Sequence, residues 1–102
     1  MSNFQYRGFD LSGRVAIITG GGTGIGKAIA LGMAQAGADL VLIGRRIKPL
    51  KEVAKEVQAM GRKALCHSAD IRKLAQIRSV VRETVREFGK IDILVNNAAV
   101  AI

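Results

Sequence analysis

Five of the seven residues from Gly20 to Gly26 are glycine, and this cluster follows a short β-branched run, 14–19. Glycine has no side chain to keep a ligand away from the backbone, and the first amide groups of a helix attract anions. Because the residues after the cluster have the apolar spacing of a helix, we expect these amides to meet at one place. The cluster therefore predicts a phosphate or pyrophosphate site, and a phosphorylated nucleotide as its ligand.

Two nucleotide-binding patterns and a plain turn compete for this cluster. The segment from Gly21 to Lys27 has the P-loop spacing G-x-x-x-x-G-K, but Ala28 stands where serine or threonine would hold magnesium. The expected strand ends, Gly44 and Asn96, offer no acidic partner for a metal, and the spacing G-x-G-x-x-G does not occur. What remains is T-G-x-x-x-G-x-G starting at Thr19, which a tight strand-to-helix turn could also explain.

The rest of the chain alternates between strand-like and helix-like segments. Short branched apolar runs predict strands, and apolar residues three or four positions apart predict helices. Each connection between strands has room for one helix, which favours a parallel sheet with helices on both faces, in the doubly wound α/β class. Ligands of such sheets bind beyond the carboxyl ends of the strands, where the glycine cluster lies. The predicted strands are 14–19, 39–44, 63–68 and one within 91–102, and the predicted helices are 25–37, one from Pro49 to about 60, and 74–88.

Composition limits the class of protein. The 102 residues are 49% hydrophobic and 24% charged, which fits a globular chain of one domain or part of one. No apolar run approaches the roughly 18 residues that span a bilayer, and residues 1–13 form a polar lead-in without the character of a signal peptide. The single cysteine, Cys66, has no partner in the sequence for a disulfide or a metal. We therefore expect a cytoplasmic protein with no membrane partner and no metal site.

The net charge of +8 raises the question of a nucleic-acid partner. The basic residues, however, are mixed with acidic ones in segments such as K-E-V-A-K-E-V and R-S-V-V-R-E-T-V-R-E-F-G-K, which predicts solvated helix faces. Aromatic residues make up only 4% of the chain and do not lie among the basic clusters, so stacking on bases is not expected. The sequence argues against a nucleic-acid partner.

Three motifs, in matching order and spacing over nearly the whole chain, resemble those of the short-chain dehydrogenase/reductase family. The glycine cluster with Thr19 matches the family's T-G-x-x-x-G-x-G cofactor loop, Asp70-Ile71 matches its adenine-contacting pair, and Asn96-Asn97-Ala98-Ala99 is similar to its N-N-A-G motif, with Ala99 in place of glycine. The resemblance implies a Rossmann-like sheet, here β-α-β-α-β-α-β and incomplete after the fourth strand. It also implies hydride transfer between a nicotinamide cofactor and a small alcohol or carbonyl substrate, in a homo-oligomeric parent enzyme. Carried over residue by residue, the implied cofactor-binding set is Gly20, Gly22, Thr23, Gly24, Ile25, Gly26, Asp70, Ile71, Asn97, Ala98 and Ala99.

The second predicted strand bears on which nicotinamide cofactor is bound. An NAD site has an acid at the end of this strand for the ribose 2′-hydroxyl, and such an acid would repel the 2′-phosphate of NADP. Here Gly44 stands at that position and is followed by Arg45, whose guanidinium could pair with a phosphate. The sequence favours NADP over NAD. The other interpretation is that Arg45 and Arg46 are solvated loop charges.

The residues that would catalyse the reaction are not found in the sequence. The family's serine and Y-x-x-x-K motif follow the fourth strand, whereas the only tyrosine here is Tyr6. We therefore interpret residues 14–102 as the N-terminal cofactor-binding part of a reductase, inactive by itself. A stand-alone nucleotide-binding module and a nonfunctional truncation product remain as alternatives. Three of the matched residues also have simpler interpretations, Asp70 as the N-cap of the next helix, and Asn96 and Asn97 as partners for backbone groups at a strand end.

Overall fold

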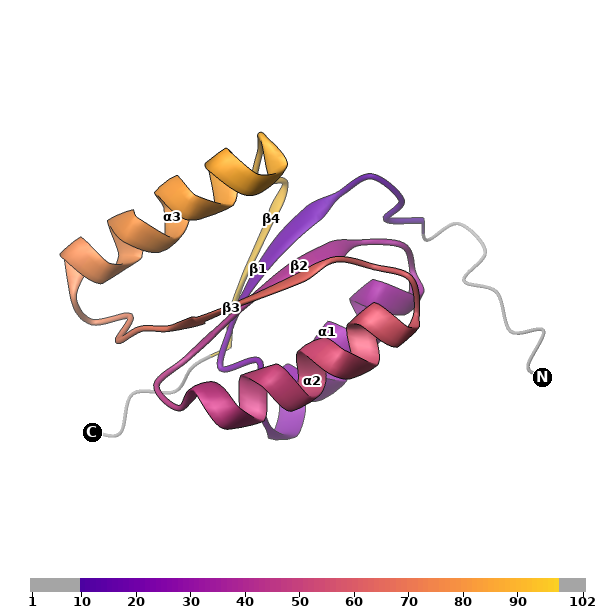
Figure 1. The fold of residues 1–102 in the computed structure, drawn as a ribbon, viewed down its shortest axis with the longest axis horizontal. Coiled ribbons are helices and arrows are strands. Elements are labelled where there is room, and N and C mark those ends of the chain that lie inside the picture. Colours follow the sequence, from indigo (N-terminus) through magenta and orange to yellow (C-terminus); the bar gives the residue numbers. More distant parts are fainter. Residues whose placement is uncertain (1–9, 98–102) are drawn as a thin grey trace.

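The computed structural model describes residues 10–97, which form strands and helices in strict alternation (Figure 1). Every predicted element is present, with small differences at the ends. Helix α2 begins at Ile47, before the predicted Pro49, and Pro49 lies in its first turn, where a missing amide hydrogen costs no helical bond. In chain order the elements are β1 (Val15–Thr19), α1 (Gly24–Gln35), β2 (Asp39–Gly44), α2 (Ile47–Ala59), β3 (Ala64–Ser68), α3 (Leu74–Phe88) and β4 (Ile93–Asn96).

The strands form one parallel sheet in the order β3-β2-β1-β4. The chain builds outward from β1 to β3 and then crosses to the other side of β1 to add β4 (Figure 1). This reversal brings the carboxyl ends of β1 and β4 side by side, where Thr19 pairs with Asn96. The predicted doubly wound α/β fold is confirmed.

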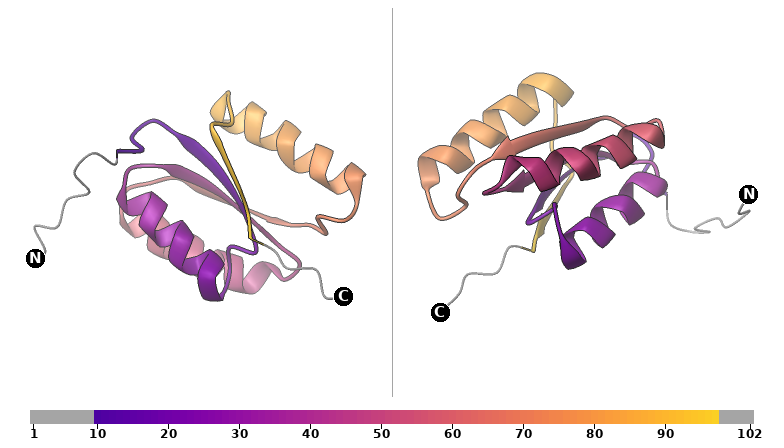
Figure 2. Two further views of the ribbon diagram at one scale, coloured as in Figure 1. Left: turned by 180° about the vertical axis from the view of Figure 1, so that it is seen from behind. Right: turned by 60° about the horizontal axis from the view of Figure 1, so that its bottom comes forward.

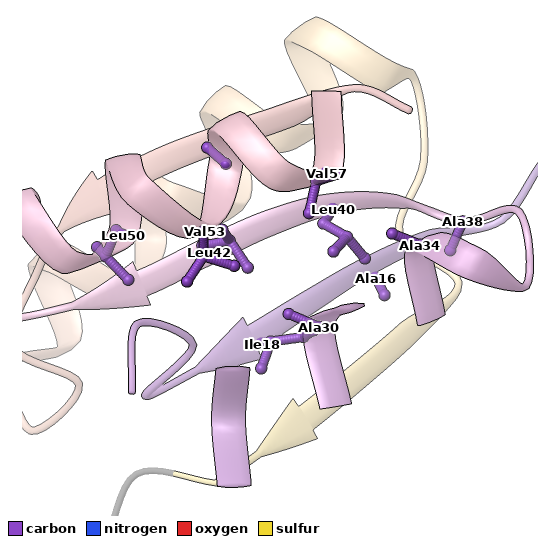
Figure 3. Packing of buried hydrophobic residues seen from close by; sticks show 11 residues of the cluster. Ala16, Ile18, Ala30, Ala34, Ala38, Leu40, Leu42, Leu50, Val53 and Val57 are labelled. Carbon is purple, nitrogen blue, oxygen red and sulfur yellow. The ribbon is translucent and has the colours of Figure 1, made fainter. Parts of the chain in front are cut away.

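Helices cover both faces of the sheet. Helices α1 and α2 lie on one face and α3 lies on the other (Figure 2). The larger core fills the layer under α1 and α2, where Leu40 and Leu42 of β2 pack with Leu50 of α2 (Figure 3). Helix α1 adds only small buried side chains to this core, Ala30 and Ala34, so its backbone can lie close to the strands.

The apolar residues of α3 are only partly buried. The spacing that predicts this helix includes Leu74, Val81 and Val85, but these side chains are 62%, 40% and 46% exposed. The buried residues of α3 are Val80 and Thr84, and the Thr84 hydroxyl donates to the Val80 carbonyl oxygen at 2.7 Å. Within residues 10–97, β4 is the last strand on its side of the sheet, and the apolar side of α3 is covered only in part.

One carboxylate joins the start of β4 to β1. Asp92 accepts a hydrogen bond from the amide of the buried Val15 at 2.8 Å, and its own amide donates to the Val15 carbonyl oxygen at 2.9 Å. Lys90 and Arg14 lie beside the same carboxylate, at 3.2 and 3.8 Å. The hydrogen bond from Val15, with support from the two cations, lowers the pKa of Asp92.

We expect Asp92→Ala to destabilise the fold at neutral pH, since the buried Val15 amide loses its acceptor. Because the pKa of Asp92 is lowered in the folded state, the carboxylate stabilises the fold above the usual carboxyl pKa, and this contribution is lost as the pH falls through the folded-state value. Urea unfolding followed by circular dichroism should therefore give a lower midpoint for the variant at neutral pH and a smaller difference at strongly acidic pH. A difference that does not change with pH would contradict this role for the charge.

Candidate cofactor-binding site

A cavity of about 440 Å³ lies at the carboxyl edge of the sheet. The loops that follow β1, β2 and β3 form its wall, together with the start of α2. Ile43 and Leu50 give it apolar surface, and three exposed arginines, Arg45, Arg46 and Arg72, belong to its lining. Apolar surface suits a flat base and cations suit phosphates, so the cavity has the chemistry of a nucleotide site.

Most of the predicted site residues come together here. Gly24, Ile25 and Gly26 form the first turn of α1 beside the cavity, and Asn97 directly follows β4. Ala98 and Ala99 lie outside the described residues. The predicted residues that line the cavity itself are Gly20, Gly22, Thr23, Arg45, Asp70 and Ile71.

The start of α1 packs directly on the turn before it. A Cβ atom at Gly26 would overlap the carbonyl oxygen of Gly20 and would lie 2.7 Å from Asn97 Nδ2. The Asn97 side chain also donates to that carbonyl oxygen, at 3.4 Å. At Gly26, therefore, the protein's own backbone is what excludes a side chain.

Gly24 differs because its surroundings are open. No atom lies within 4 Å of the position that its Cβ would take, and its φ of 56° is a left-handed conformation that favours glycine. Alanine here would strain the backbone, although its Cβ would meet no neighbouring part of the protein. The loop is thus accessible to an external group at Gly24, as the sequence pattern predicts for a ligand-binding loop.

Helices α1, α2 and α3 all begin at this edge of the sheet. Their N-cap residues, Thr23, Arg46 and Lys73, make no side-chain capping bond, and none of the three helices has an acidic residue in its first turn. Their first amide groups and positive dipole ends are therefore not neutralised by a carboxylate of their own. The carboxyl edge of the sheet is positive, which favours an anionic ligand.

Thr19 ties the end of β1 to the end of β4. Its hydroxyl donates to Asn96 Oδ1 at 3.1 Å and accepts from the Asn97 backbone amide at 2.9 Å. Together with the bond from Asn97 to Gly20, these contacts hold the glycine loop against β4. The simpler interpretation, in which the side chain satisfies a backbone group at a strand end, is confirmed for Asn97, whereas the Asn96 side chain accepts from the Thr19 hydroxyl and not from a backbone group. A direct contact of Asn97 with a cofactor stays a prediction.

Asp70 joins two of the three arginines. Its carboxylate accepts two bonds from the Arg72 guanidinium, from Nε at 3.0 Å and Nη2 at 2.9 Å, and one bond from Arg45 Nη2 at 3.2 Å. The Arg72 backbone amide donates to it as well, at 3.0 Å. These contacts, with those of Arg72 the strongest, hold the pKa of the Asp70 carboxyl well below its usual range. Asp70 is therefore ionised, and its charge is already paired.

The interpretation of Asp70 as the N-cap of the next helix is wrong. The N-cap of α3 is Lys73, whose amide donates to the carbonyl oxygen of Asp70 at 3.0 Å in an intervening turn. The Asp70 amide donates to Gln76 Oε1 at 2.7 Å. Because this turn separates Asp70 from the helix, its carboxylate meets the arginines and not the first amides of α3.

Two hydrogen bonds fix the loop that carries Arg45. Ser68, at the end of β3, donates from Oγ to the Arg45 carbonyl oxygen at 2.9 Å, and the Ala69 amide donates to the Gly44 carbonyl oxygen at 2.9 Å. The Arg45 backbone is thus held while its side chain is 68% exposed. Neither Ser68 nor Arg72 is among the site residues that the sequence motifs predict. An arginine close behind Asp70 is the signal that could have pointed to Arg72.

Other kinds of site find no support in the described part of the chain. Lys27, which a P-loop would direct at a phosphate, lies 3.4 Å from Glu56 of α2 and does not line the cavity. Within residues 10–97 no helix is long and apolar enough to cross a membrane, and no group of three metal-binding side chains is found.

The fold and the cavity define a nucleotide-binding α/β protein of the doubly wound type, and comparison with known proteins identifies the family. The family model described as short chain dehydrogenase matches residues 14–102. The chain belongs to the short-chain dehydrogenase family.

Relatives of known activity and structure are close in sequence but longer. The 2-dehydro-3-deoxy-D-gluconate 5-dehydrogenase of Escherichia coli K12 is 49% identical over 90 residues, which cover 88% of this chain and 35% of that protein. L-sorbose reductase from Gluconobacter frateurii, whose structure was solved in complex with NADPH and L-sorbose, is 39% identical to this chain with a TM-score of 0.86. The match covers 92% of this chain and 36% of the reductase chain. A short-chain dehydrogenase from Mycobacterium paratuberculosis, solved with NAD bound, is 35% identical with a TM-score of 0.83. That match covers 90% of this chain and 39% of the dehydrogenase chain. The chain spans about a third of the length of the relatives it matches.

Gly26→Ala should destabilise the fold by about 1–3 kcal/mol, the usual cost of forcing a side chain into filled space, because its Cβ would overlap the Gly20 backbone. Gly32→Ala in the same helix is the matched control. No atom lies within 4 Å of the Gly32 Cβ position, so alanine there should add roughly 0.5–1 kcal/mol of stability. Urea unfolding of the three proteins measures both effects. A Gly26→Ala protein as stable as the unmutated chain would show that α1 does not pack on the turn in this way.

Proposed function

We propose that residues 14–102 are the cofactor-binding part of an NADP-preferring oxidoreductase that transfers a hydride between NADP(H) and a small alcohol or carbonyl substrate. Residues 1–13 would be a lead-in to this domain. The observation that carries the proposal is the charge of the cavity, where three arginines accompany a single carboxylate that is already paired. A cavity of this charge suits a ligand with several phosphate groups.

The cofactor would be held by three loops. The glycine loop from Gly20 to Gly26 would meet the pyrophosphate, since its amides and the dipole of α1 attract an anion. Asp70 and Ile71 would lie along the adenine, and residues 97–99 beside a ribose. When bound, the nicotinamide gives or accepts the hydride. The residues of this part bind and orient the cofactor, and we assign the proton donor of the reaction to sequence that this chain does not contain.

The preference for NADP is argued from the end of β2. Gly44 has no carboxylate to oppose a phosphate, and the exposed Arg45 follows it. The bond of Arg45 to Asp70 is a surface ion pair, which contributes little net stability and can be exchanged for another partner. A doubly charged phosphate would be a stronger partner for the guanidinium. Because solved relatives include one with NADPH and one with NAD, membership of the family does not by itself decide between the cofactors.

We expect NADPH to bind more tightly than NADH, and Arg45→Ala to weaken NADPH binding about tenfold or more with little effect on NADH. The size corresponds to one charge-assisted hydrogen bond of about 1.5–3 kcal/mol. Lys55→Ala, which removes an exposed cation of α2 outside the cavity lining, is the matched control for net charge. Dissociation constants come from fluorescence titration of each protein. Equal affinity of the unmutated chain for the two cofactors would refute the preference.

Reductase turnover is expected to be absent from the 102-residue chain even where cofactor binds, because general acid catalysis needs a positioned proton donor and the Y-x-x-x-K pattern does not occur in the sequence. The purified chain would be assayed for NADPH oxidation against ketones, aldehydes and ketoses. Turnover that follows the protein through successive purification steps would overturn the assignment of catalysis to other sequence.

A further inference from the structure

We propose that Arg72 determines cofactor specificity by neutralising Asp70, which leaves Arg45 available to the 2′-phosphate of NADP. Arg72 is then a positioning residue that acts through Asp70, and it needs no contact of its own with the phosphate. The inference rests on the proposed function and adds to it the residue that makes Arg45 effective.

The two arginines bind Asp70 in different ways. Arg72 makes a fork of two bonds to both carboxylate oxygens, at 3.0 and 2.9 Å, and adds a backbone bond at 3.0 Å. Arg45 makes one longer bond, at 3.2 Å, to an oxygen that Arg72 also uses. Two-point contacts between guanidinium and carboxylate are the stronger kind. When Arg45 moves to another anion, the carboxylate keeps its principal partner.

Proximity along the chain also favours the pair with Arg72. Arg72 follows Asp70 by two positions in the same turn, whereas Arg45 reaches it from the end of a neighbouring strand. The Asp70 side chain is only 14% exposed, so its ionised form depends on its protein partners more than a solvated carboxylate would. The local pair with Arg72 supplies a partner that does not depend on the position of the β2 loop.

The charges show why this pair matters for a phosphate. With Arg72 present, Asp70 shares its single negative charge between two guanidiniums, so the cluster of Asp70, Arg72 and Arg45 keeps a net positive charge at the cavity. Without Arg72, the Asp70 carboxylate would hold Arg45 and would also repel an incoming phosphate. Both effects weaken binding of the 2′-phosphate and neither depends on the rest of the cofactor. Loss of Arg72 should therefore change the selectivity for the phosphate more than the affinity for adenosine.

The test uses two ligands that differ only in the 2′-phosphate, adenosine 2′,5′-bisphosphate and 5′-AMP. Binding of each to the 102-residue chain is measured by calorimetry for the unmutated protein, Arg72→Ala and the double variant Asp70→Asn/Arg72→Ala. Arg82→Ala, which removes an exposed arginine further along α3, is the control for net charge. Circular dichroism of each protein checks that it is folded.

We expect Arg72→Ala to lower the affinity ratio of bisphosphate to monophosphate by about tenfold, Arg82→Ala to leave it nearly unchanged, and the double variant to restore most of it. A ratio that Arg72→Ala does not change would overturn the inference and leave the proposed function intact. A double variant as poor as the single one would mean that Arg72 binds the phosphate directly, which also overturns it. An unmutated chain that does not distinguish the ligands would refute the NADP preference itself.

A measurement without ligand tests the same idea independently. Carbon-13 NMR of the Asp70 carboxyl in a pH titration should show a higher pKa in Arg72→Ala than in Arg45→Ala, because the Arg72 bonds are the main cause of the lowered pKa. If removal of Arg45 raised the pKa more than removal of Arg72, Arg45 would be the principal partner of Asp70, and the inference would be wrong.

Discussion

The rest of the structure depends on how closely the start of α1 approaches the turn after β1. With no side chain at Gly26, the helix backbone lies against the carbonyl oxygen of Gly20, and Asn97 completes the contact from the end of β4. One additional carbon atom at Gly26 would push α1 away from the sheet, together with Ala30 and Ala34 on its buried side. The glycine loop, α1 and β4 therefore form a single packing unit, and this unit determines where the loop amides point.

The positive charge of the site follows from the topology of the sheet. Parallel strands with helical crossovers start α1, α2 and α3 at one edge, and none of these helices has an acid in its first turn. Among the described residues that line the cavity, Asp70 is the single acid, and two guanidiniums contact it. Many of the other basic residues lie on solvated helix faces. The positive charge of this edge thus comes from aligned helix ends and from the excess of arginines over carboxylates in the cavity lining more than from the net charge of the chain.

The two faces of the sheet are covered unequally for the same topological reason. The crossovers from β1 to β3 bring two helices to one face, and the crossover to β4 brings only α3 to the other (Figure 2). Under α3 a second cavity of about 260 Å³ is lined mostly by apolar side chains, and Leu94 of β4 is 66% exposed beside it. Residues 10–97 therefore bury the α1 and α2 face well and the α3 face only in part.

The sequence by itself determined the order and type of the elements, because apolar periodicity is a local property and each strand and helix carries its own. The sequence also determined that the glycine loop and Arg45 lie at the carboxyl edge of the sheet, since each directly follows a predicted strand. Only the tertiary structure decided that Asp70 pairs with Arg72 and Arg45 and caps no helix, because that arrangement needs the parallel register of β2 and β3 and an intervening turn. The tertiary structure likewise decided that position 26 must be glycine, because a side chain there would overlap the Gly20 backbone, and that Leu74 is exposed. A sequence shows which side chains follow one another, whereas the packing of the sheet decides which of them share the same space.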